Sequence, residues 1–269
     1  MERYLYKELE QWSSSENRRP LILFGARQVG KTWLLKEFGN RRYKNVAFVS
    51  FDRNDAAVQL MTAEKSAEKI LRGLSAVTGI DIVPSDTLVI LDEIQDCPIA
   101  LTRLKALAED APDYHIAACG SLLGIALHEG VSYPVGQVDE MYLYPMTFGE
   151  FLLANGKDKM QALLAESDWA MINAISSEYV DLLRQYYYVG GMPAAVKAYV
   201  EGKGLNAVRT QQKQILNDYD RDFSKHAPTR VVSRIRMVWQ SIVSQLTKEN
   251  KKFIFGALKN GARASDFEE

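Results

Sequence analysis

Short apolar runs alternate with segments of helical spacing in the first half of the chain. The runs are apolar at nearly every position, which is typical of strands buried on both faces of a sheet. Four strands are predicted, at residues 21–24, 46–51, 88–91 and 114–119. Helices are predicted at residues 1–12, 32–38, 63–77 and 99–108. This alternation indicates a parallel sheet covered by helices on both sides.

The strand signals stop near residue 145, and the rest of the chain has helical patterns. Thr147 and Glu150 fit a capping box at the start of the first of these helices. Helices are predicted at residues 148–154, 158–165, 179–188, 194–200, 205–222, 231–246 and 252–259. The pattern therefore divides the chain into an α/β part at 1–145 and a mostly helical part, in which we distinguish residues 146–202 from a basic helical segment at 203–269. A new helix begins near Ser265, so we expect the natural protein to continue past Glu269.

Composition places the chain among ordinary globular proteins, with 47% hydrophobic and 25% charged residues. The only two cysteines, Cys97 and Cys119, lie in apolar surroundings and predict buried thiols in a reducing cytoplasm. The chain has no apolar run near the roughly 18 residues that a membrane span requires. Residues 203–263 carry 13 Lys and Arg against 4 acids, or +9, which leaves −10 on the remainder of a chain whose net charge is −1.

A glycine-rich loop carries the strongest chemical signal. Residues 25–32, Gly-Ala-Arg-Gln-Val-Gly-Lys-Thr, match the pattern G-x-x-x-x-G-K-[ST] between a predicted strand and a predicted helix. Gly25 and Gly30 allow backbone turns that direct the amides of Ala26, Arg27, Gln28 and Val29 toward a polyphosphate. Lys31 would reach the β- and γ-phosphates, and the Thr32 hydroxyl would bind Mg²⁺. The alternative is a strand-to-helix turn with a chance lysine.

Two acids end the apolar strand at 88–91. Asp92 and Glu93 would lie at the carboxyl edge of the sheet, where open α/β sheets bind their ligands. Asp92 would help hold Mg²⁺, and Glu93 would orient or deprotonate the attacking water. An acid directly after the metal-binding aspartate favours hydrolysis over phosphoryl transfer to a second metabolite. The alternative is that either acid caps the next helix.

Ser121 follows the last predicted strand. In nucleotide hydrolases with an additional strand between the phosphate-loop strand and the acidic strand, this tip faces the γ-phosphate. Ser121 is therefore a candidate γ-phosphate sensor. It could equally be the N-cap of a helix, and the two roles are compatible.

Several motifs occur together in the order found in a known group of proteins. They lie at residues 25–32, 88–95, 120–121, 144–151, 190–193 and 245–253. The chain resembles the uncharacterised prokaryotic AAA+-type ATPases, which carry an AAA core and a C-terminal domain of unknown function. The resemblance implies a P-loop NTPase sheet of strand order 5-1-4-3-2, a helical lid at 146–202 and a partial winged-helix-like segment. It also implies that the further domain lies beyond Glu269.

The lid of this group suggests a second set of nucleotide contacts. The group is similar to signal-transducing ATPases in which a glycine-proline step approaches the adenine, so Gly191 and Pro193 are candidates for that contact. Structurally, Gly190 or Gly191 could simply end one helix while Pro193 begins the next. Arg27, Arg53 and Arg103 could each serve the nucleotide or the fold, and no arginine finger is assigned.

The basic segment at 203–263 could contact DNA phosphates or a protein partner, or it could pack against the acidic body. The sequence thus predicts an enzyme that binds ATP and Mg²⁺ and hydrolyses ATP slowly as a molecular switch. The alternative is a nucleic-acid-binding regulator whose ATP site controls conformation with little turnover. A small-molecule kinase is disfavoured by Glu93. Oligomerisation is compatible with either reading, and no membrane partner is expected.

Overall fold

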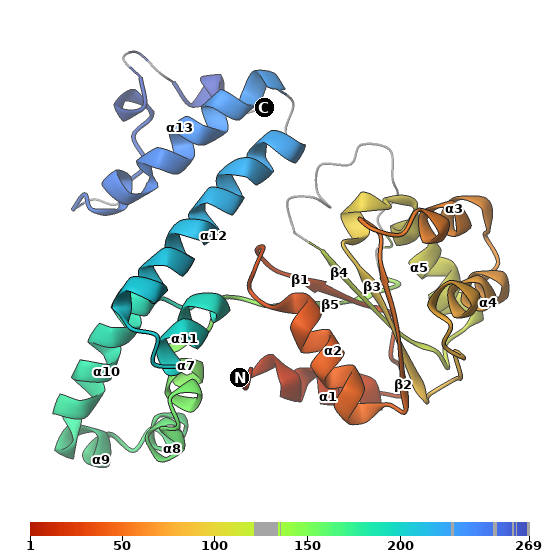
Figure 1. Cartoon of the computed structure of the whole chain (residues 1–269), viewed down its shortest axis with the longest axis horizontal. Coiled ribbons are helices and arrows are strands. Elements are labelled where there is room, and N and C mark those ends of the chain that lie inside the picture. The colour runs from red at the N-terminus through yellow and green to blue at the C-terminus, as the bar shows by residue number, and fades with distance from the viewer. Residues whose placement is uncertain are drawn as a thin grey trace. The chain divides into compact units, whose positions relative to one another are not determined.

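The computed structural model describes residues 1–120, 134, 136–226, 229–249, 252–259, 261 and 263–267 (Figure 1). The chain divides into two compact units, Met1–Arg209 and Thr210–Glu269, with the boundary inside a long helix. The first unit contains a sheet and a group of lid helices. The second unit is helical. No helix among the described residues combines the length and the apolar character required to cross a bilayer.

The first unit is built on a five-stranded parallel sheet of order β2-β3-β4-β1-β5. Its strands are β1 (Leu21–Phe24), β2 (Asn45–Ser50), β3 (Thr87–Asp92), β4 (His115–Gly120) and β5 (Asp139–Tyr142). This order confirms the predicted arrangement 5-1-4-3-2. The four strands predicted from apolar runs are present within one residue at each end. The edge strand β5 has alternating burial and a polar sequence, so the apolar pattern alone missed it.

Helices cover both faces of the sheet because successive strand residues point to opposite sides. Leu21 and Leu23 pack with α1 (Leu5–Ser14) and α2 (Lys31–Arg42). Ile22 and Phe24 belong to the second core, on the opposite face. That core is completed by α3 (Asp55–Ala63), α4 (Ala67–Thr78) and α5 (Ile99–Asp110). Figure 1 shows the two groups of helices on opposite sides of the strands.

The single helix predicted at 63–77 is replaced by the end of one helix and most of a second one. Ala63 is the last residue of α3, and α4 begins at Ala67. The first helix starts earlier than predicted because the Asn54 side chain accepts a hydrogen bond from the amide of Ala57 and caps it. Three residues in non-helical conformation then separate the two helices.

Five short helices occupy the segment predicted as a lid, residues 146–202, and we call them the lid helices. They are α7 (Phe148–Ala154), α8 (Asp158–Glu166), α9 (Trp169–Ala174), α10 (Ser176–Val189) and α11 (Pro193–Val200). The capping box at Thr147 and Glu150 is confirmed. Gly190 has φ +75° after α10, and Pro193 is the first residue of α11. The short helix α9 was not predicted; the Asp168 side chain caps it by accepting from the amide of Met171.

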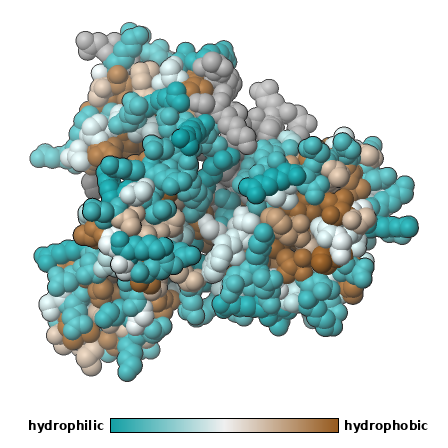
Figure 2. Space-filling view, viewed as in Figure 1, coloured by the Kyte–Doolittle hydropathy of each residue, from teal (hydrophilic) through white to brown (hydrophobic). Residues whose placement is uncertain are grey.

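The lid has an apolar interior of its own, which includes Phe151, Val189 and Val196. Some apolar side chains also remain at its surface: Trp169 is 63% exposed and Met171 is 50% exposed. Figure 2 shows scattered hydrophobic groups on an otherwise mainly hydrophilic surface. Isolated exposed apolar residues are normal for globular proteins and define no site by themselves.

The second unit contains most of α12 (Leu205–His226) and all of α13 (Thr229–Leu246). The prediction of a helix at 252–259 is wrong, because this segment contains only a short 3₁₀ turn at Phe255–Ala257. The Gln245 amide explains the difference. Its Nε2 donates to the Ile254 carbonyl at 3.0 Å, and its Oε1 accepts from the Ile254 amide at 3.2 Å. The N–H and C=O groups of Ile254 are thereby occupied, and the residue is held in an extended conformation that is incompatible with an α-helix.

Candidate nucleotide site

The loop after β1 has the backbone that its sequence predicts. Gly30 has φ +96°, a left-handed conformation that favours glycine. Gly25 is required by a close approach, since a Cβ there would lie 2.3 Å from the carbonyl oxygen of Leu143. Gln28 also adopts a left-handed φ of +64°, whereas Val29 is fully buried and anchors the loop. The loop thus curls at the carboxyl end of β1, with α2 starting at Lys31.

Lys31 folds back over this loop. Its Nζ donates to the carbonyl oxygens of Gly25 at 2.8 Å and Ala26 at 2.9 Å. Burial lowers the pKa of Lys31, and the nearby carboxylates of Glu93 and Asp92 oppose that change. The ammonium group is therefore placed at the mouth of the loop, surrounded by hydrogen-bond acceptors.

Thr32, in the first turn of α2, contacts Asp92 at the carboxyl end of β3. The Thr32 hydroxyl donates to the Asp92 carboxylate, with Oγ1 at 2.9 Å from Oδ1 and 3.1 Å from Oδ2. Asp92 ends β3 opposite Cys119 of β4, and the Cys119 thiol donates to Asp92 Oδ1 at 2.9 Å. Burial and the neighbouring Asp92 charge raise the pKa of Cys119 far above its usual value. The thiol therefore stays protonated and donates to the carboxylate.

Glu93 follows Asp92 in a left-handed conformation with φ +52°. Its carboxylate accepts a hydrogen bond from the side-chain amide of Gln95. Gln95 is 2% exposed, and its Oε1 is buried without a hydrogen-bond partner among the described residues. Gln95 is thus a buried polar residue whose amide holds the predicted catalytic acid. Ser121 lies outside the described residues.

A pocket of about 410 Å³ adjoins the end of the loop. Its lining residues come from the N-terminus, from the loop and α2, and from the lid: Met1, Arg3, Gly30, Trp33, Met146, Pro193, Ala194, Lys197, Val200 and Glu201. A Cβ placed on Gly30 would lie 3.8 Å from Cγ of Pro193, which puts the proline beside the loop. Pro193 therefore lies beside Gly30, and its contact with the adenine stays a prediction.

Gly191 has a different environment from Pro193. Its carbonyl accepts from the Met146 amide at 2.7 Å, and a Cβ on Gly191 would lie 2.3 Å from the Met146 carbonyl oxygen. Gly191 does not line the described pocket. Close packing against the segment that enters the lid accounts for a glycine here, so its predicted nucleotide contact stays a prediction.

The three arginines weighed from the sequence have different surroundings. Arg103 is 8% exposed, and its Nε donates to the Met61 carbonyl at 2.9 Å, which joins α5 to the end of α3. Arg53 is largely exposed and pairs with Asp52 at 3.3 Å. Arg27 lies within the loop. Arg103 therefore has a packing role in this structure.

Sequence reasoning missed one residue that reaches the loop from far away in the chain. Arg3 is 7% exposed and donates to the carbonyl oxygen of Val29 at 2.8 Å. It also pairs with Glu150 at 3.0 Å. The capping-box pattern identified Glu150 as a helix cap, but no local pattern indicates that an arginine 147 positions earlier is its partner.

A comparison with protein families identifies the class of protein. Residues 17–152 match the family described as "AAA domain", which is half of the chain, and the chain belongs to that family. Residues 180–269 match a family described as "Domain of unknown function (DUF8612)". The resemblance placed a domain of unknown function beyond Glu269, whereas this match lies within the chain. The fold is accordingly that of an AAA-type P-loop protein.

Two solved structures are similar to the chain at low identity. One is AMPPCP-bound DnaA from Aquifex aeolicus, with 14% identity, a TM-score of 0.42, and coverage of 96% of this chain and 81% of that one. The other is Drosophila ORC bound to DNA, with 13% identity, a TM-score of 0.41, and coverage of 93% and 69%. A comparison with curated proteins found no match.

Proposed function

We propose that this protein binds ATP with Mg²⁺ at the Gly25–Thr32 loop and hydrolyses it slowly as a molecular switch. The observation that carries the proposal is the contact between Thr32 and Asp92, at 2.9 and 3.1 Å. The two residues belong to motifs 60 residues apart in the chain, and they meet at one edge of the sheet. A cation bound to the nucleotide would lie at this position.

The phosphate contacts follow from the loop. Its backbone amides and the start of α2 supply partial positive charge, and Lys31 supplies a full charge. The contacts of Lys31 with the Gly25 and Ala26 carbonyls show that its side chain reaches over the loop. We assign phosphate binding to residues 25–32.

The oxygen donors of Thr32 and Asp92 fit a hard cation such as Mg²⁺, which prefers oxygen ligands. When bound, the cation would neutralise charge on the phosphates. Thr32 and Asp92 would hold it, and the Cys119 thiol would keep the Asp92 carboxylate in place by donating to Oδ1.

Glu93 is the residue we assign to orienting the attacking water. It directly follows Asp92, and its carboxylate is held by Gln95 rather than by a cation. Ser121 is assigned to γ-phosphate sensing on the basis of its sequence position alone.

The adenine would occupy the pocket between Gly30 and the lid. Trp33 and Pro193 offer apolar surface, and apolar walls with a few polar groups are typical of sites for flat ligands. Because Gly191 contacts Met146, this glycine would affect the nucleotide by positioning the lid and not by touching the adenine. A cytoplasmic location, inferred from the buried thiols, is part of this proposal.

Single-turnover hydrolysis of ATP by Glu93→Gln tests the assignment. We expect the rate to fall about 100-fold, as for loss of a general base, while the affinity for ATP changes less than about twofold. Glu37→Gln is the matched control, since Glu37 is a surface residue of α2 paired with Arg41. Hydrolysis by Glu93→Gln at the wild-type rate would remove Glu93 from its assigned role.

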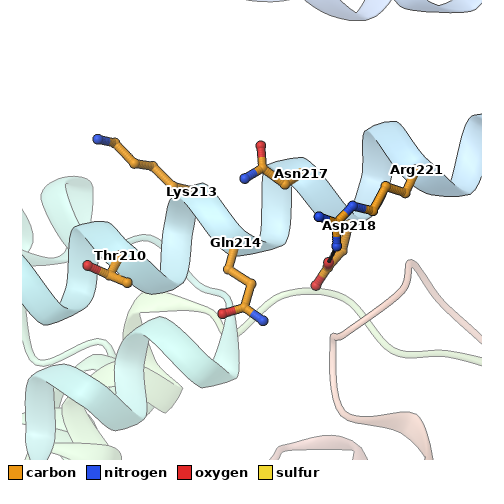
Figure 3. Close-up of a pocket in the computed structure, with 6 residues that line it drawn as sticks. All are labelled: Thr210, Lys213, Gln214, Asn217, Asp218 and Arg221. Carbon is orange, nitrogen blue, oxygen red and sulfur yellow. Dashed lines mark ion pairs between the residues drawn. The ribbon is translucent and has the colours of Figure 1, made fainter.

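A second candidate function rests on α12. Lys213, Asn217 and Arg221 recur every four residues and line an open pocket of about 350 Å³ with Thr210, Gln214 and Asp218 (Figure 3). Such a polar row within the basic segment suits a nucleic-acid backbone, although Arg221 already lies 3.8 Å from Asp218. A salt series of DNA binding tests it: absence of DNA affinity at 50 mM salt excludes this function.

A further inference from the structure

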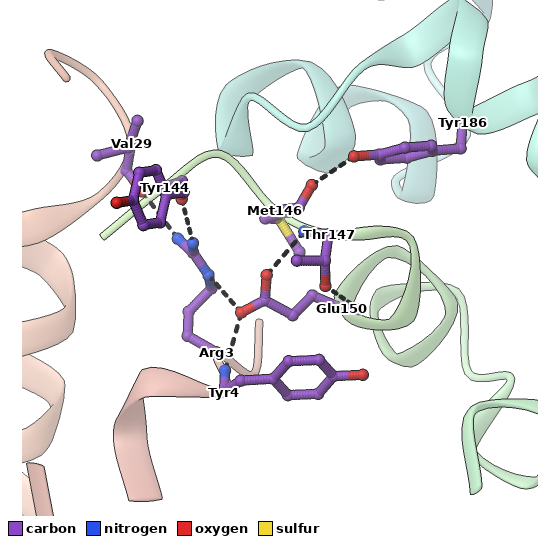
Figure 4. Close-up of polar contacts among 8 residues, drawn as sticks. All are labelled: Arg3, Tyr4, Val29, Tyr144, Met146, Thr147, Glu150 and Tyr186. Carbon is purple, nitrogen blue, oxygen red and sulfur yellow. Dashed lines mark hydrogen bonds and ion pairs between the residues drawn. The ribbon is translucent and has the colours of Figure 1, made fainter. Parts of the chain in front are cut away.

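The side chain of Arg3 joins three separate parts of the first unit. Its Nε donates to Glu150 Oε1 at 3.0 Å, its Nη1 to the Val29 carbonyl at 2.8 Å, and its Nη2 to the Tyr144 carbonyl at 2.5 Å (Figure 4). These acceptors belong to the lid, to the phosphate loop and to the segment that follows β5. A planar guanidinium can serve three acceptors in fixed directions, whereas a lysine ammonium lacks that geometry.

Glu150 connects the same arginine to the start of the lid. Its Oε2 accepts from the Thr147 amide at 2.8 Å, which is half of the capping box of α7. Its Oε1 accepts from the Tyr4 amide at 2.8 Å as well as from Arg3. One buried carboxylate therefore caps the first lid helix and binds the arginine that contacts the loop.

The contact with Val29 has a consequence for the phosphate site. A trans peptide is planar, and its carbonyl and N–H groups point in opposite directions. Because Arg3 holds the Val29 carbonyl, it also restricts the direction of the Gly30 N–H. Gly30 directly precedes Lys31, in the part of the loop whose amides are assigned to phosphate binding.

We propose that Arg3 is a positioning residue that orients the Gly30 amide for phosphate and links the phosphate loop to the lid through Glu150. This inference rests on the proposed function. Arg3 also lines the pocket assigned to the adenine. Its hydrogen bond to the Val29 carbonyl places the proposed effect on the phosphates, which ATP and tripolyphosphate share. The ion pair with Glu150 makes the first turn of α7 part of the same unit as the loop.

Binding of two ligands separates this role from a purely structural one. We would titrate ATP and inorganic tripolyphosphate, each with Mg²⁺, into wild type, Arg3→Lys, Glu150→Gln and the double variant. Arg3→Lys is expected to lower the affinity for both ligands by the same factor, about tenfold, which corresponds to loss of one charge-assisted hydrogen bond. The double variant is expected to bind no more weakly than Arg3→Lys, since both changes break one connection.

The control is Arg41→Lys, which changes an exposed arginine of α2 paired with Glu37 and is expected to bind as wild type. Circular dichroism melts establish that each variant is folded at the titration temperature. If Arg3→Lys fails to fold, the affinities of Glu150→Gln for the two ligands test the proposal. This variant should fold, because glutamine retains acceptor and donor groups at the cap. Glu150→Gln is then expected to weaken both ligands several-fold.

Wild-type affinity for both ligands in folded Arg3→Lys and Glu150→Gln would overturn the inference and leave the proposed function intact. Failure of wild type itself to bind ATP would overturn both. Hydrogen exchange tests the link to the lid. ATP should protect the amides of Phe148–Ala154 in wild type, and this protection should disappear in Arg3→Lys while the loop remains protected. Equal protection of these lid amides in both proteins would contradict the link.

Discussion

Gly191 packs directly against the backbone of Met146. The Met146 amide donates to the Gly191 carbonyl at 2.7 Å, and a Cβ on Gly191 would lie 2.3 Å from the Met146 carbonyl oxygen. That same oxygen accepts from the Tyr186 hydroxyl at 2.8 Å, so it cannot shift freely. The segment that enters the lid is thus held by α10 and by the turn before α11.

Gly191→Ala should therefore destabilise the first unit. The added methyl group would force backbone apart, and such overpacking typically costs about 1–3 kcal/mol in the free energy of unfolding. Urea unfolding measures it. Gly256→Ala is the control, because a Cβ there meets no atom of the described residues within 4 Å and the expected change is below about 0.5 kcal/mol. Equal stability of both variants would show that the turn can move.

Gln95→Leu should increase the rate of ATP hydrolysis. The Gln95 amide donates to the Glu93 carboxylate and competes with water for it. Leucine has a similar size and removes the buried Oε1, which has no hydrogen-bond partner in the part of the chain that the structure describes, so stability should not fall. We expect a rate several-fold above wild type at saturating ATP, measured by phosphate release, with ATP affinity unchanged. A slower variant would mean that Gln95 holds Glu93 in its working position.

Pro193→Ala should weaken ATP binding without affecting tripolyphosphate. Pro193 lines the pocket beside Gly30, and alanine is accepted at the first position of a helix. Loss of apolar contact with the base should cost about fivefold in ATP affinity, or roughly 1 kcal/mol. Isothermal titration with both ligands measures this. A loss of tripolyphosphate affinity would place Pro193 on the phosphate side of the site.

His115 should make the folded state sensitive to acid. Its Nδ1 lies 2.6 Å from the Tyr43 hydroxyl, and burial lowers the pKa of His115 to about 4 while raising that of Tyr43 to about 12. The folded pKa of His115 is below the unfolded value near 6.5, so the unfolded state takes up the proton first. The contribution of His115 to the free energy of unfolding is fully present above pH 6.5 and is lost as the pH falls toward 4.

Urea unfolding at pH 7 and pH 5 measures that loss. His115→Gln, which does not titrate, should show a smaller decrease in stability between these two pH values than wild type. An equal decrease in both proteins would assign the acid sensitivity to other groups.

The parts of the fold that were predicted are those encoded in neighbouring residues. Leu21 to Phe24 are apolar throughout, and a strand with helices on both faces follows from that alone. The polar edge strand β5 has no such signal, because its side chains are only half covered. The absent helix at 252–259 depends on the side chain of Gln245, which no local pattern takes into account.

The same distinction holds for the site. The loop at 25–32 and the pair Asp92–Glu93 can be recognised because their chemistry lies in consecutive residues. Arg3 meets Glu150 only after the chain has folded, and the contact is invisible to any periodicity. Gln95 was part of a recognised motif, but its contact with Glu93 depends on the left-handed turn at Glu93.

Calorimetric titration of ATP with Mg²⁺ into the wild type and Lys31→Ala tests the central claim most directly. Lys31 contacts the loop through its ammonium group, so its removal should leave the fold intact and take away the main charge that faces the phosphates. Saturable binding by wild type and at least about 100-fold weaker binding by Lys31→Ala is the predicted result. Absence of binding heat in the folded wild type, or equal binding by both proteins, would contradict it.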